Sequence, residues 1–303
     1  MQLKKDVWRC AIVPVPLQHV IARGSLADLP LTWLPGSGNL RYLADPFGIW
    51  RGNQLYVFTE FFDYRDAVGR IIVTIFDRAL QFVEQAEVLR EPWHLSYPFV
   101  FEADGETWLL PEAYQSGGLW LYRALDFPMR WQRVGRIALD GIPLDATPVY
   151  DGTRWWLFYS PAFPEAHRLT HLCAAWADKL EGPWTSHAGN PILVEANGAR
   201  PGGTPAWYDS VLHLPVQDCR GTYGAALRIV RFDVLTPDRV MTAETVALRA
   251  PAAASPYLDG CHTLSSAGDV TLIDVKQTRF SPRGLAMRPL RDLRRSWHTL
   301  VRG

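Results

Sequence analysis

The most constraining feature of this sequence is a proline-containing unit that recurs along its 303 residues. In each unit a proline and an apolar run precede an Asp or Gly turn, and a strand rich in Trp, Leu and Tyr follows. The prolines are spaced 52, 50 and 57 residues apart, at Pro46, Pro98, Pro148 and Pro205, and a looser fifth unit opens at His262. Repeats of this length are typical of β-propeller blades and similar arrays. Five units predict one five-bladed propeller, since about 60 residues accommodate four short strands and their turns.

The turns inside the units favour β-hairpins, because Gly, Asn and Asp tolerate the positive φ that tight turns require. We therefore expect an all-β chain in which residues 1–303 form a single domain, with blades at approximately 40–90, 91–140, 141–195, 196–250 and 251–280. The last unit is short of strands, and an open sheet edge invites aggregation. Residues 7–15 are expected to supply its missing outer strand and close the ring. The only helix that we predict is a short one at the C-terminus.

Charge excludes some functions. Lys and Arg together number 31, as do Asp and Glu, so no overall field attracts nucleic acid. Residues 277–303 are locally basic, with seven Arg against Asp292 alone. Two interpretations of this tail stay open: a helix that contacts acidic lipid or a partner protein, or a terminal helix docked on the propeller with its arginines in solvent. Neither a signal-peptide core nor an 18-residue apolar span is present, which predicts a cytoplasmic protein.

The expected site lies where the blades converge. The first strand of each propeller blade lines the central channel, so residues that open the five units meet although they are distant in sequence. Polar groups there are costly to bury without partners. Either they have a function or they form a hydrogen-bonded network that pins the blades together, and the set comprises Asp45, Tyr97, Asp145 with Thr147, Arg200 with Thr204, and His262.

Carboxylates are the leading catalytic candidates. Two acids across a pocket, one ionised and one protonated, are what cleavage of a glycosidic bond requires, and Asp45 and Asp145 are placed for it. A second acidic set ends the second strands, where each member is alternatively an exposed strand-end carboxylate: Glu60, Glu112, Asp218 and Asp274. Glu112 stands out because an aromatic, glycine-containing loop suited to covering a ligand follows it. The four cysteines show no CxxC spacing, so neither a disulfide framework nor a zinc ribbon is indicated.

A family resemblance rests on several motifs spread over residues 6–276. They include residues 42–47 (YLADPF), 59–60 (TE), 94–101 (HLSYPFVF), 111–112 (PE), 121–124 (LYRA), 199–203 (ARPGG), 217–219 (QDC) and 262–263 (HT). Together they resemble the N-terminal domain of plant glucosamine inositolphosphorylceramide transferases and bacterial relatives, some of them called formyltransferase-like. In the plant proteins glycosyl transfer is attributed to a separate domain, so this resemblance implies a carbohydrate-related module.

The architecture is more distantly similar to the five-bladed arabinanase, xylosidase and invertase glycosidases. This likeness implies that Asp45 acts as base or nucleophile and that Asp145 tunes pKa values and orients the sugar. Those enzymes place an acidic Glu in the fourth blade, where this sequence has Arg200, so we assign the acid role to Glu112. His262 matches a histidine that faces the centre and helps to hold a metal or water. We expect no cofactor beyond a structural cation or water near His262.

Arg200 suggests an anionic sugar, with Gln217 and His262 assisting in its binding. The leading hypothesis is a carbohydrate-active enzyme that cleaves or transfers a glycosyl unit of an anionic sugar, glycolipid or polysaccharide precursor. The alternative is a non-catalytic module that binds a glycan or a sugar nucleotide. A third hypothesis is a scaffolding propeller that docks through its basic tail.

Overall fold

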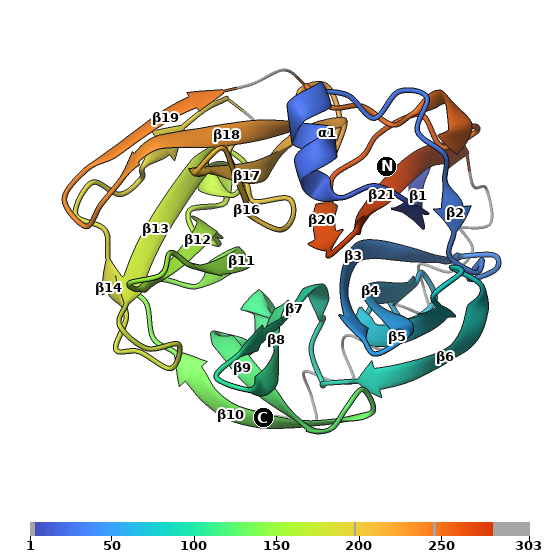
Figure 1. The fold of residues 1–303 in the computed structure, drawn as a ribbon, viewed down its shortest axis with the longest axis horizontal. Coiled ribbons are helices and arrows are strands. Elements are labelled where there is room, and N and C mark those ends of the chain that lie inside the picture. The colour runs from blue at the N-terminus through green and yellow to red at the C-terminus, as the bar shows by residue number, and fades with distance from the viewer. Residues whose placement is uncertain (1–3, 197, 245–246, 281–303) are drawn as a thin grey trace.

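The computed structural model describes residues 4–196, 198–244 and 247–280, and these form a five-bladed β-propeller. Figure 1 shows the five antiparallel sheets arranged as a ring around a central channel. The first three blades each build outward from an innermost strand. Blade 1 contains β3 (Arg41–Arg51), β4 (Gln54–Asp63), β5 (Arg70–Asp77) and β6 (Phe82–Leu89), and blade 2 contains β7 (Ser96–Ala103), β8 (Glu106–Glu112), β9 (Leu119–Asp126) and β10 (Arg130–Ile137). Blade 3 contains β11 (Pro143–Tyr150), β12 (Trp155–Pro161) and β13 (His171–Ala177), with β14 (Thr185–Ser186) and β15 (Leu193–Val194) both paired to β13.

Blade 4 contains β16 (Ala206–Tyr208), β17 (Val211–Asp218), β18 (Ala226–Leu235) and β19 (Val240–Glu244). The fifth blade joins the two ends of the described chain. Its inner strands are β20 (Leu264–Ala267) and β21 (Val270–Phe280), followed outward by β1 (Lys4–Val13) and β2 (Thr32–Trp33). The pairing of β1 with β21 runs from Lys4 opposite Phe280 to Val13 opposite Thr271.

Ring closure by an N-terminal outer strand is therefore confirmed. β1 lies outside β20 and β21 as the third strand of the blade, and the two-residue β2, which was not predicted, lies beyond it. The predicted C-terminal helix and the basic tail beyond Phe280 lie outside the described residues.

A short helix, α1 (Leu17–Arg23), was not predicted. It follows Pro16 and ends at Gly24, whose φ of 63° allows its N–H to bond the carbonyls of Val20 and Ile21. Leu17 and Val20 are buried in a hydrophobic cluster that side chains of blades 4 and 5 share. Seven residues are too few to show helical periodicity in the sequence. Three 3₁₀ turns complete the described elements: Tyr114–Ser116, Glu165–His167 and Ala252–Ala254.

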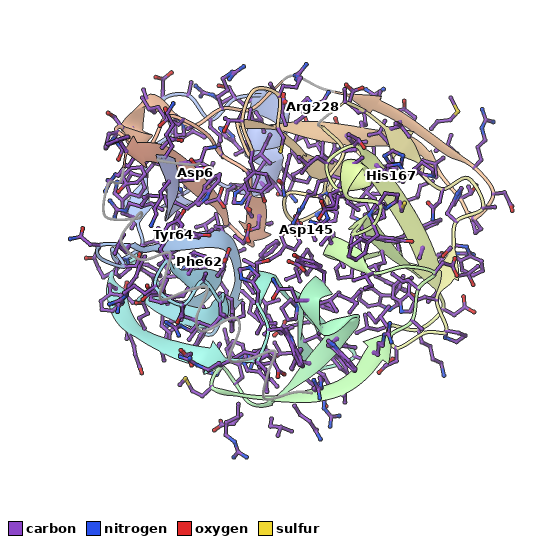
Figure 2. All side chains as sticks on the ribbon, turned by 180° about the vertical axis from the view of Figure 1, so that it is seen from behind. Asp6, Phe62, Tyr64, Asp145, His167 and Arg228 are labelled. Atoms are coloured by element: carbon purple, nitrogen blue, oxygen red, sulfur yellow. The ribbon has the colours of Figure 1, made fainter. Side chains whose placement is uncertain are left out.

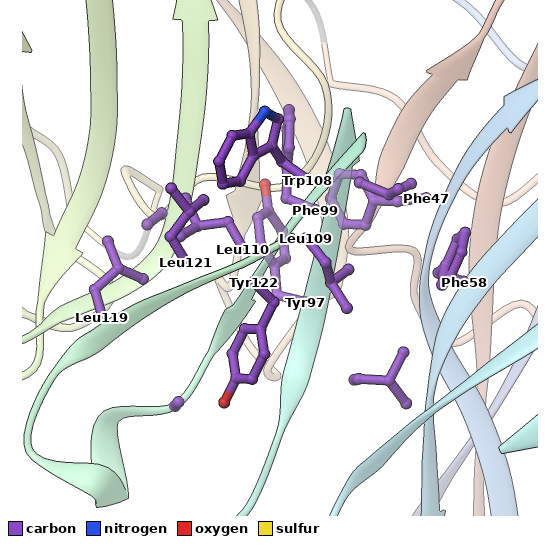
Figure 3. Packing of buried hydrophobic residues seen from close by; sticks show 14 of the residues in the cluster. Phe47, Phe58, Tyr97, Phe99, Trp108, Leu109, Leu110, Leu119, Leu121 and Tyr122 are labelled. Carbon is purple, nitrogen blue, oxygen red and sulfur yellow. The ribbon is translucent and has the colours of Figure 1, made fainter. Parts of the chain in front are cut away.

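Large apolar side chains fill the spaces between neighbouring blades. Between blades 1 and 2 the ring of Phe47 packs edge-on against Tyr97, with centroids 4.7 Å apart, and at a tilt of 46° against Phe99, at 5.0 Å (Figure 3). Edge-to-face pairs of this kind add to the stability gained from burial. The four cysteines are free and buried. No helix in the described part of the chain is long and apolar enough to cross a bilayer.

Candidate functional site

The innermost strands of blades 1, 2 and 3 each carry a bulge at the same point. Strand pairing shifts register between Ala44 and Phe47, between Ser96 and Phe99, and between Leu144 and Thr147. Inside these bulges Asp45, Tyr97 and Asp145 have φ values of 51°, 45° and 48°. Positive φ is unfavourable for residues other than glycine and is concentrated at functional sites, and a bulge redirects a side chain.

The bulges also correct the alignment of the third repeat. Thr147 pairs with Phe158 as Phe47 pairs with Phe58, so Thr147 corresponds to Phe47 and not to Asp45. The residue equivalent to Asp45 is Asp145. Aligning Pro148 with Pro46 would have given Thr147, two positions later. Figure 2 shows Asp145 toward the centre of the ring.

A cavity of about 250 Å³ lies at this convergence. Six of the ten predicted site residues line it: Asp45, Glu60, Glu112, Asp145, Arg200 and His262. The remaining lining residues were not predicted as site residues: Trp8, Tyr42, Ala44, His94, Ser96, Tyr114, Gln115 and Tyr223.

Asp45 is buried and joins three blades. Its Oδ2 accepts a hydrogen bond of 3.1 Å from the backbone N–H of Tyr97, and its Oδ1 accepts one of 2.8 Å from the Thr263 hydroxyl. The Nε2 atom of His262 lies 3.5 Å from Oδ1. Burial raises the pKa of Asp45 to about 6, an effect that His262 opposes and that Asp274 reinforces. Asp45 is thus a carboxyl group that ionises close to neutral pH.

Asp274 lies behind this carboxyl group and outside the cavity lining. Its Oδ1 accepts the backbone N–H groups of His262 and Thr263, and its Oδ2 accepts that of Asp45. The same Oδ2 is 2.7 Å from Nδ1 of His262. Burial disfavours charge on both side chains, but their mutual attraction outweighs it, so the pKa of His262 is raised and that of Asp274 is lowered. Asp274 therefore orients His262 and is placed as a supporting residue.

Asp45, His262 and Asp274 offer ligand atoms within 4.8 Å of one another, which is close enough for a cation. However, Nδ1 of His262 and Oδ2 of Asp274 lie 2.7 Å apart as a buried ion pair. A cation bound to both atoms would have to displace the proton of Nδ1. The cation expected near His262 stays a prediction, and this ion pair together with the backbone hydrogen bonds to Asp274 accounts for the cluster as it stands.

Asp145 is matched by Arg200. The guanidinium donates from Nε to Oδ2 at 2.5 Å and from Nη2 to Oδ1 at 2.8 Å, and the amide of Gln217 donates to Oδ2 at 2.8 Å. The exposed fractions of the Arg200 and Asp145 side chains are 14% and 3%. A bidentate pair of this kind is strong and geometrically specific. Arg200 is therefore not a free cation for an anionic ligand, and Gln217 lies behind Asp145 rather than in the cavity.

Glu112 faces the cavity from the end of β8. Its Oε1 accepts the backbone N–H of Tyr114 at 2.6 Å, and its Oε2 accepts the Ser96 hydroxyl at 3.0 Å. Burial and the nearby charge of Asp145 raise its pKa to about 7, against the opposing effect of the Tyr114 bond. Glu112 consequently exchanges a proton at neutral pH, as an acid–base group must. Glu60 occupies the corresponding end of β4, and burial followed by the charge of Asp45 raises its pKa well above the usual range.

Two predicted ligand-binding residues have structural partners instead. The Tyr97 hydroxyl lies 2.9 Å from the Thr147 hydroxyl and accepts the backbone N–H of Gly203 at 2.8 Å, which ties blade 2 to blades 3 and 4. Asp218 lies outside the cavity lining and forms an ion pair with Arg220 at 2.6 Å. The pinning network that we had considered as an alternative thus describes Tyr97 well.

Aromatic residues of the site came from segments that the repeats did not mark. Trp8, on β1, stacks on His262 with ring centroids 3.9 Å apart and an interplanar angle of 20°. Tyr223 packs edge-on against His262 at 5.4 Å. Trp8 precedes the first repeat, so no periodic signal could locate it. His94 was visible in the HLSYPFVF motif, three residues before Tyr97, but we gave it no role.

The fold and the cavity define a five-bladed propeller whose channel mouth carries acid–base groups. Its architecture is similar to solved glycosidases: Zg3597, a family 117 glycoside hydrolase of Zobellia galactanivorans (TM-score 0.57, 15% identity, covering 83% of this chain and 90% of that chain), and RS223-β-xylosidase (0.54, 16%, 71% and 80%). A third is CoXyl43, a β-xylosidase/α-arabinofuranosidase from a compost metagenome, solved with xylotriose (0.54, 15%, 70% and 79%). At these identities the likeness concerns the fold alone.

The sequence itself identifies the family. The family described as "Glucosamine inositolphosphorylceramide transferase 1, N-terminal" matches residues 36–254, and the chain belongs to it. Glucosamine inositolphosphorylceramide transferase 1 of Oryza sativa subsp. indica is 34% identical over 202 residues, which cover 65% of this chain and 27% of the relative. The Arabidopsis thaliana protein of that name is 30% identical over 244 residues, which cover 79% and 31%. The chain thus spans less than a third of the length of these relatives.

Proposed function

We propose that this chain is a carbohydrate-active enzyme that cleaves or transfers a glycosyl unit in the channel-mouth cavity. The observation that carries the proposal is Asp45, a buried carboxyl group held at a φ of 51° and directed into a cavity that also holds proton-carrying glutamates. Cleavage of a glycosidic bond needs one carboxylate and one carboxylic acid on either side of the bond. Asp45 supplies the carboxylate, as base or nucleophile. Asp145, fixed by Arg200, orients the sugar, and Glu112 is the acid expected from the sequence.

The charge of the cavity bears on the substrate. Arg200 is matched by Asp145 and His262 by Asp274, so the lining has no unmatched cation for an anionic sugar. Glu60 and Glu112 remain as carboxyl groups without a cationic partner at hydrogen-bond distance among the described residues, and the cationic neighbour of Asp45 is His262, at 3.5 Å and shared with Asp274. We therefore propose that the sugar in the cavity is neutral or carries an amino group, in keeping with the glucosamine in the relatives' name. The alternative substrate is an anionic sugar, which Arg200 suggested in the sequence.

The alternative function is a non-catalytic module that binds a glycan or a sugar nucleotide. It is favoured by one observation: the fourth blade presents Arg200, engaged in an ion pair, where the glycosidase propellers that it resembles place an acid.

A panel of aryl glycosides separates these functions. Neutral pentosides and hexosides, hexosaminides and uronides would be offered to the protein and to Asp45→Asn, with product release and the shift in unfolding temperature both recorded, because a bound ligand stabilises the folded state. Turnover by the unsubstituted protein and its loss in the variant support the enzyme. A thermal shift without turnover supports the binding module, and preference for uronides contradicts the neutral or amino substrate.

A further inference from the structure

Glu60 differs from the other carboxyl groups of the cavity in its lack of donors. Its Oε1 is buried without a hydrogen-bond partner, and no described residue donates to either of its oxygens within bonding geometry. By contrast, Asp45 and Glu112 each accept two hydrogen bonds, and Asp145 accepts three. An ionised carboxylate that is buried without donors or a cation is very costly. The neutral acid is the form of Glu60 that this environment accommodates.

His94 is the polar neighbour of Glu60, and its orientation is fixed. Nδ1 accepts the backbone N–H of Gly69 at 2.8 Å, so the ring proton of the neutral imidazole lies on Nε2, 3.4 Å from Oε1 of Glu60. That distance is too long for a strong hydrogen bond. Burial, reinforced by the charge of Arg200, lowers the pKa of His94 to about 4, so it is uncharged at neutral pH. His94 positions Glu60 without giving it a counter-ion.

The backbone at Gly69 packs closely against His94 and Glu60, so the fold fixes the positions of these two side chains. A Cβ atom at Gly69 would lie 2.7 Å from Cε1 of His94, 2.3 Å from the carbonyl oxygen of Leu95 and 3.0 Å from Oε1 of Glu60. Only glycine allows the backbone to approach both side chains so closely.

The remaining titratable groups act in the same direction. The charged groups with the largest effect on Glu60 come from four other strands and are acidic: Asp45, Glu112, Asp145 and Asp274. Their charges add to the effect of burial and raise its pKa. Tyr42, another lining residue, has a pKa raised by burial and by Glu60, so it stays a neutral phenol.

We propose that Glu60, positioned by His94, is the proton donor to the leaving oxygen of the glycosidic bond. This inference rests on the proposed function and reassigns its acid. When the bond between the anomeric carbon and the leaving oxygen breaks, its electron pair stays on the oxygen, which takes the proton of Glu60. In a direct displacement the attacking hydroxyl or water forms the new bond to the anomeric carbon, and Asp45 takes its proton. Where Asp45 first forms a glycosyl ester, the hydroxyl or water attacks that ester in the second step and gives its proton to Glu60.

Glu112 is less suited to this role because of its own hydrogen bonds. The Ser96 hydroxyl can turn to accept a proton from Glu112, but the Tyr114 N–H can only donate. That fixed donor favours the carboxylate and ties Glu112 to the loop that follows β8. Glu112 is thereby a residue that holds the loop over the cavity.

Infrared spectroscopy tests the protonation of Glu60 without any substrate. The C=O stretch of a protonated carboxyl group is resolved from that of carboxylates, and a pH-difference spectrum would be recorded for the protein, Glu60→Gln and Glu112→Gln, with the exposed Glu84→Gln as matched control. We expect a band that persists above neutral pH and disappears only in Glu60→Gln. If the band of the unsubstituted protein is unchanged in Glu60→Gln, Glu60 does not carry the proton and the inference is wrong. This outcome does not depend on whether the protein has glycosidase activity.

Leaving-group dependence tests the donor role. An alkyl glycoside needs a proton donor, whereas a 2,4-dinitrophenyl glycoside of the same sugar does not, because its leaving phenolate is already stable. We expect Glu60→Gln to slow the alkyl substrate by about 10²–10⁴-fold and the dinitrophenyl substrate by less than about tenfold. The same pattern in Glu112→Gln, with Glu60→Gln unaffected, assigns the acid to Glu112 and overturns the inference.

The pH–rate profile separates positioning from mere stability. Removing His94 admits water beside Glu60, which stabilises the carboxylate and lowers its pKa. His94→Ala should therefore move the alkaline limb of the profile to lower pH. His94→Gln keeps an N–H group and should restore the original limb. An unmoved limb in His94→Ala contradicts the positioning role. If the unsubstituted protein turns over no glycoside of the panel, the proposed function and the donor role fail together, while the infrared band still decides whether Glu60 holds its proton.

Discussion

The carboxylate of Asp45 accepts the backbone N–H of Tyr97 at 3.1 Å, so the bulge of one blade holds the equivalent bulge of the next. Both residues have positive φ, and each lies in the bulge of the innermost strand of its blade. A catalytic candidate and a structural residue therefore share one repeated backbone geometry. What distinguishes them is the side chain: the carboxyl group of Asp45 reaches the cavity, and the phenol of Tyr97 points into the contact between blades.

Asp45→Asn should fold and lose activity. Asn tolerates positive φ, its oxygen can accept from Tyr97, and its amide can donate to the Thr263 hydroxyl, so no partner is orphaned. Its missing charge should lower turnover by about 10²–10⁴-fold. Asp45→Ala leaves the Tyr97 N–H unpaired and should cost about 1–3 kcal/mol of unfolding free energy. Chemical denaturation and turnover would be measured on both variants, and an active Asn variant removes Asp45 from the mechanism.

Glu112 predicts a specific pH dependence of stability. Folding raises its pKa from 4.5 to about 7, so between these values the folded state binds more protons than the unfolded state. Its contribution to stability therefore decreases as pH rises through this window. Glu112→Gln lacks this titration, so its unfolding free energy relative to the unsubstituted protein should increase between about pH 5 and about pH 8. Parallel urea titrations test this, and a constant difference would show that Glu112 titrates alike in both states.

Arg200→Ala should mainly destabilise the protein. It leaves Asp145 buried without its cation, which costs about 3–5 kcal/mol when one partner of such a pair is removed. Combining it with Asp145→Asn, an uncharged residue that tolerates the same backbone, should recover part of the loss, and a double-mutant cycle measures the coupling. Binding of acidic and neutral sugars by Arg200→Ala should fall equally. A loss confined to acidic sugars restores Arg200 as a ligand-binding residue.

Tyr97→Phe should weaken the ring and leave the site unchanged. The variant keeps the aromatic contact with Phe47 but leaves the buried N–H of Gly203 without its acceptor, at a cost of about 1–3 kcal/mol. Thermal unfolding measures the loss, and ligand affinity serves as the control. Impaired ligand binding in a fully stable variant would instead place the phenol in the recognition of the sugar.

The repeat predicted the fold because one hydrophobic and turn pattern recurs in every blade, and it also brought Asp45, Asp145 and His262 to one cavity. It could not predict which polar groups pair with which. Arg200 reads as a free cation in the sequence, and only the fold places it against Asp145, 55 residues away. The proline spacing alone aligns Thr147 with Asp45, whereas the strand register aligns Asp145 with it, because proline marks the strand and not the residue at which the strand bulges. Trp8 and α1 lie before the first repeat, where periodicity carries no information.

The position of β1 in the fifth blade affects the order in which the propeller folds. Lys4 to Val13 are synthesised before the other strands of the propeller and their partner β21 after them, so this pairing joins segments that are far apart in the described sequence. Contacts of such sequence separation form late and slowly. Because Trp8 belongs to β1 and stacks on His262, the cavity is completed by the same event that joins the first and last blades of the ring. A chain that has formed four blades but not the fifth still lacks the Trp8 wall of the cavity.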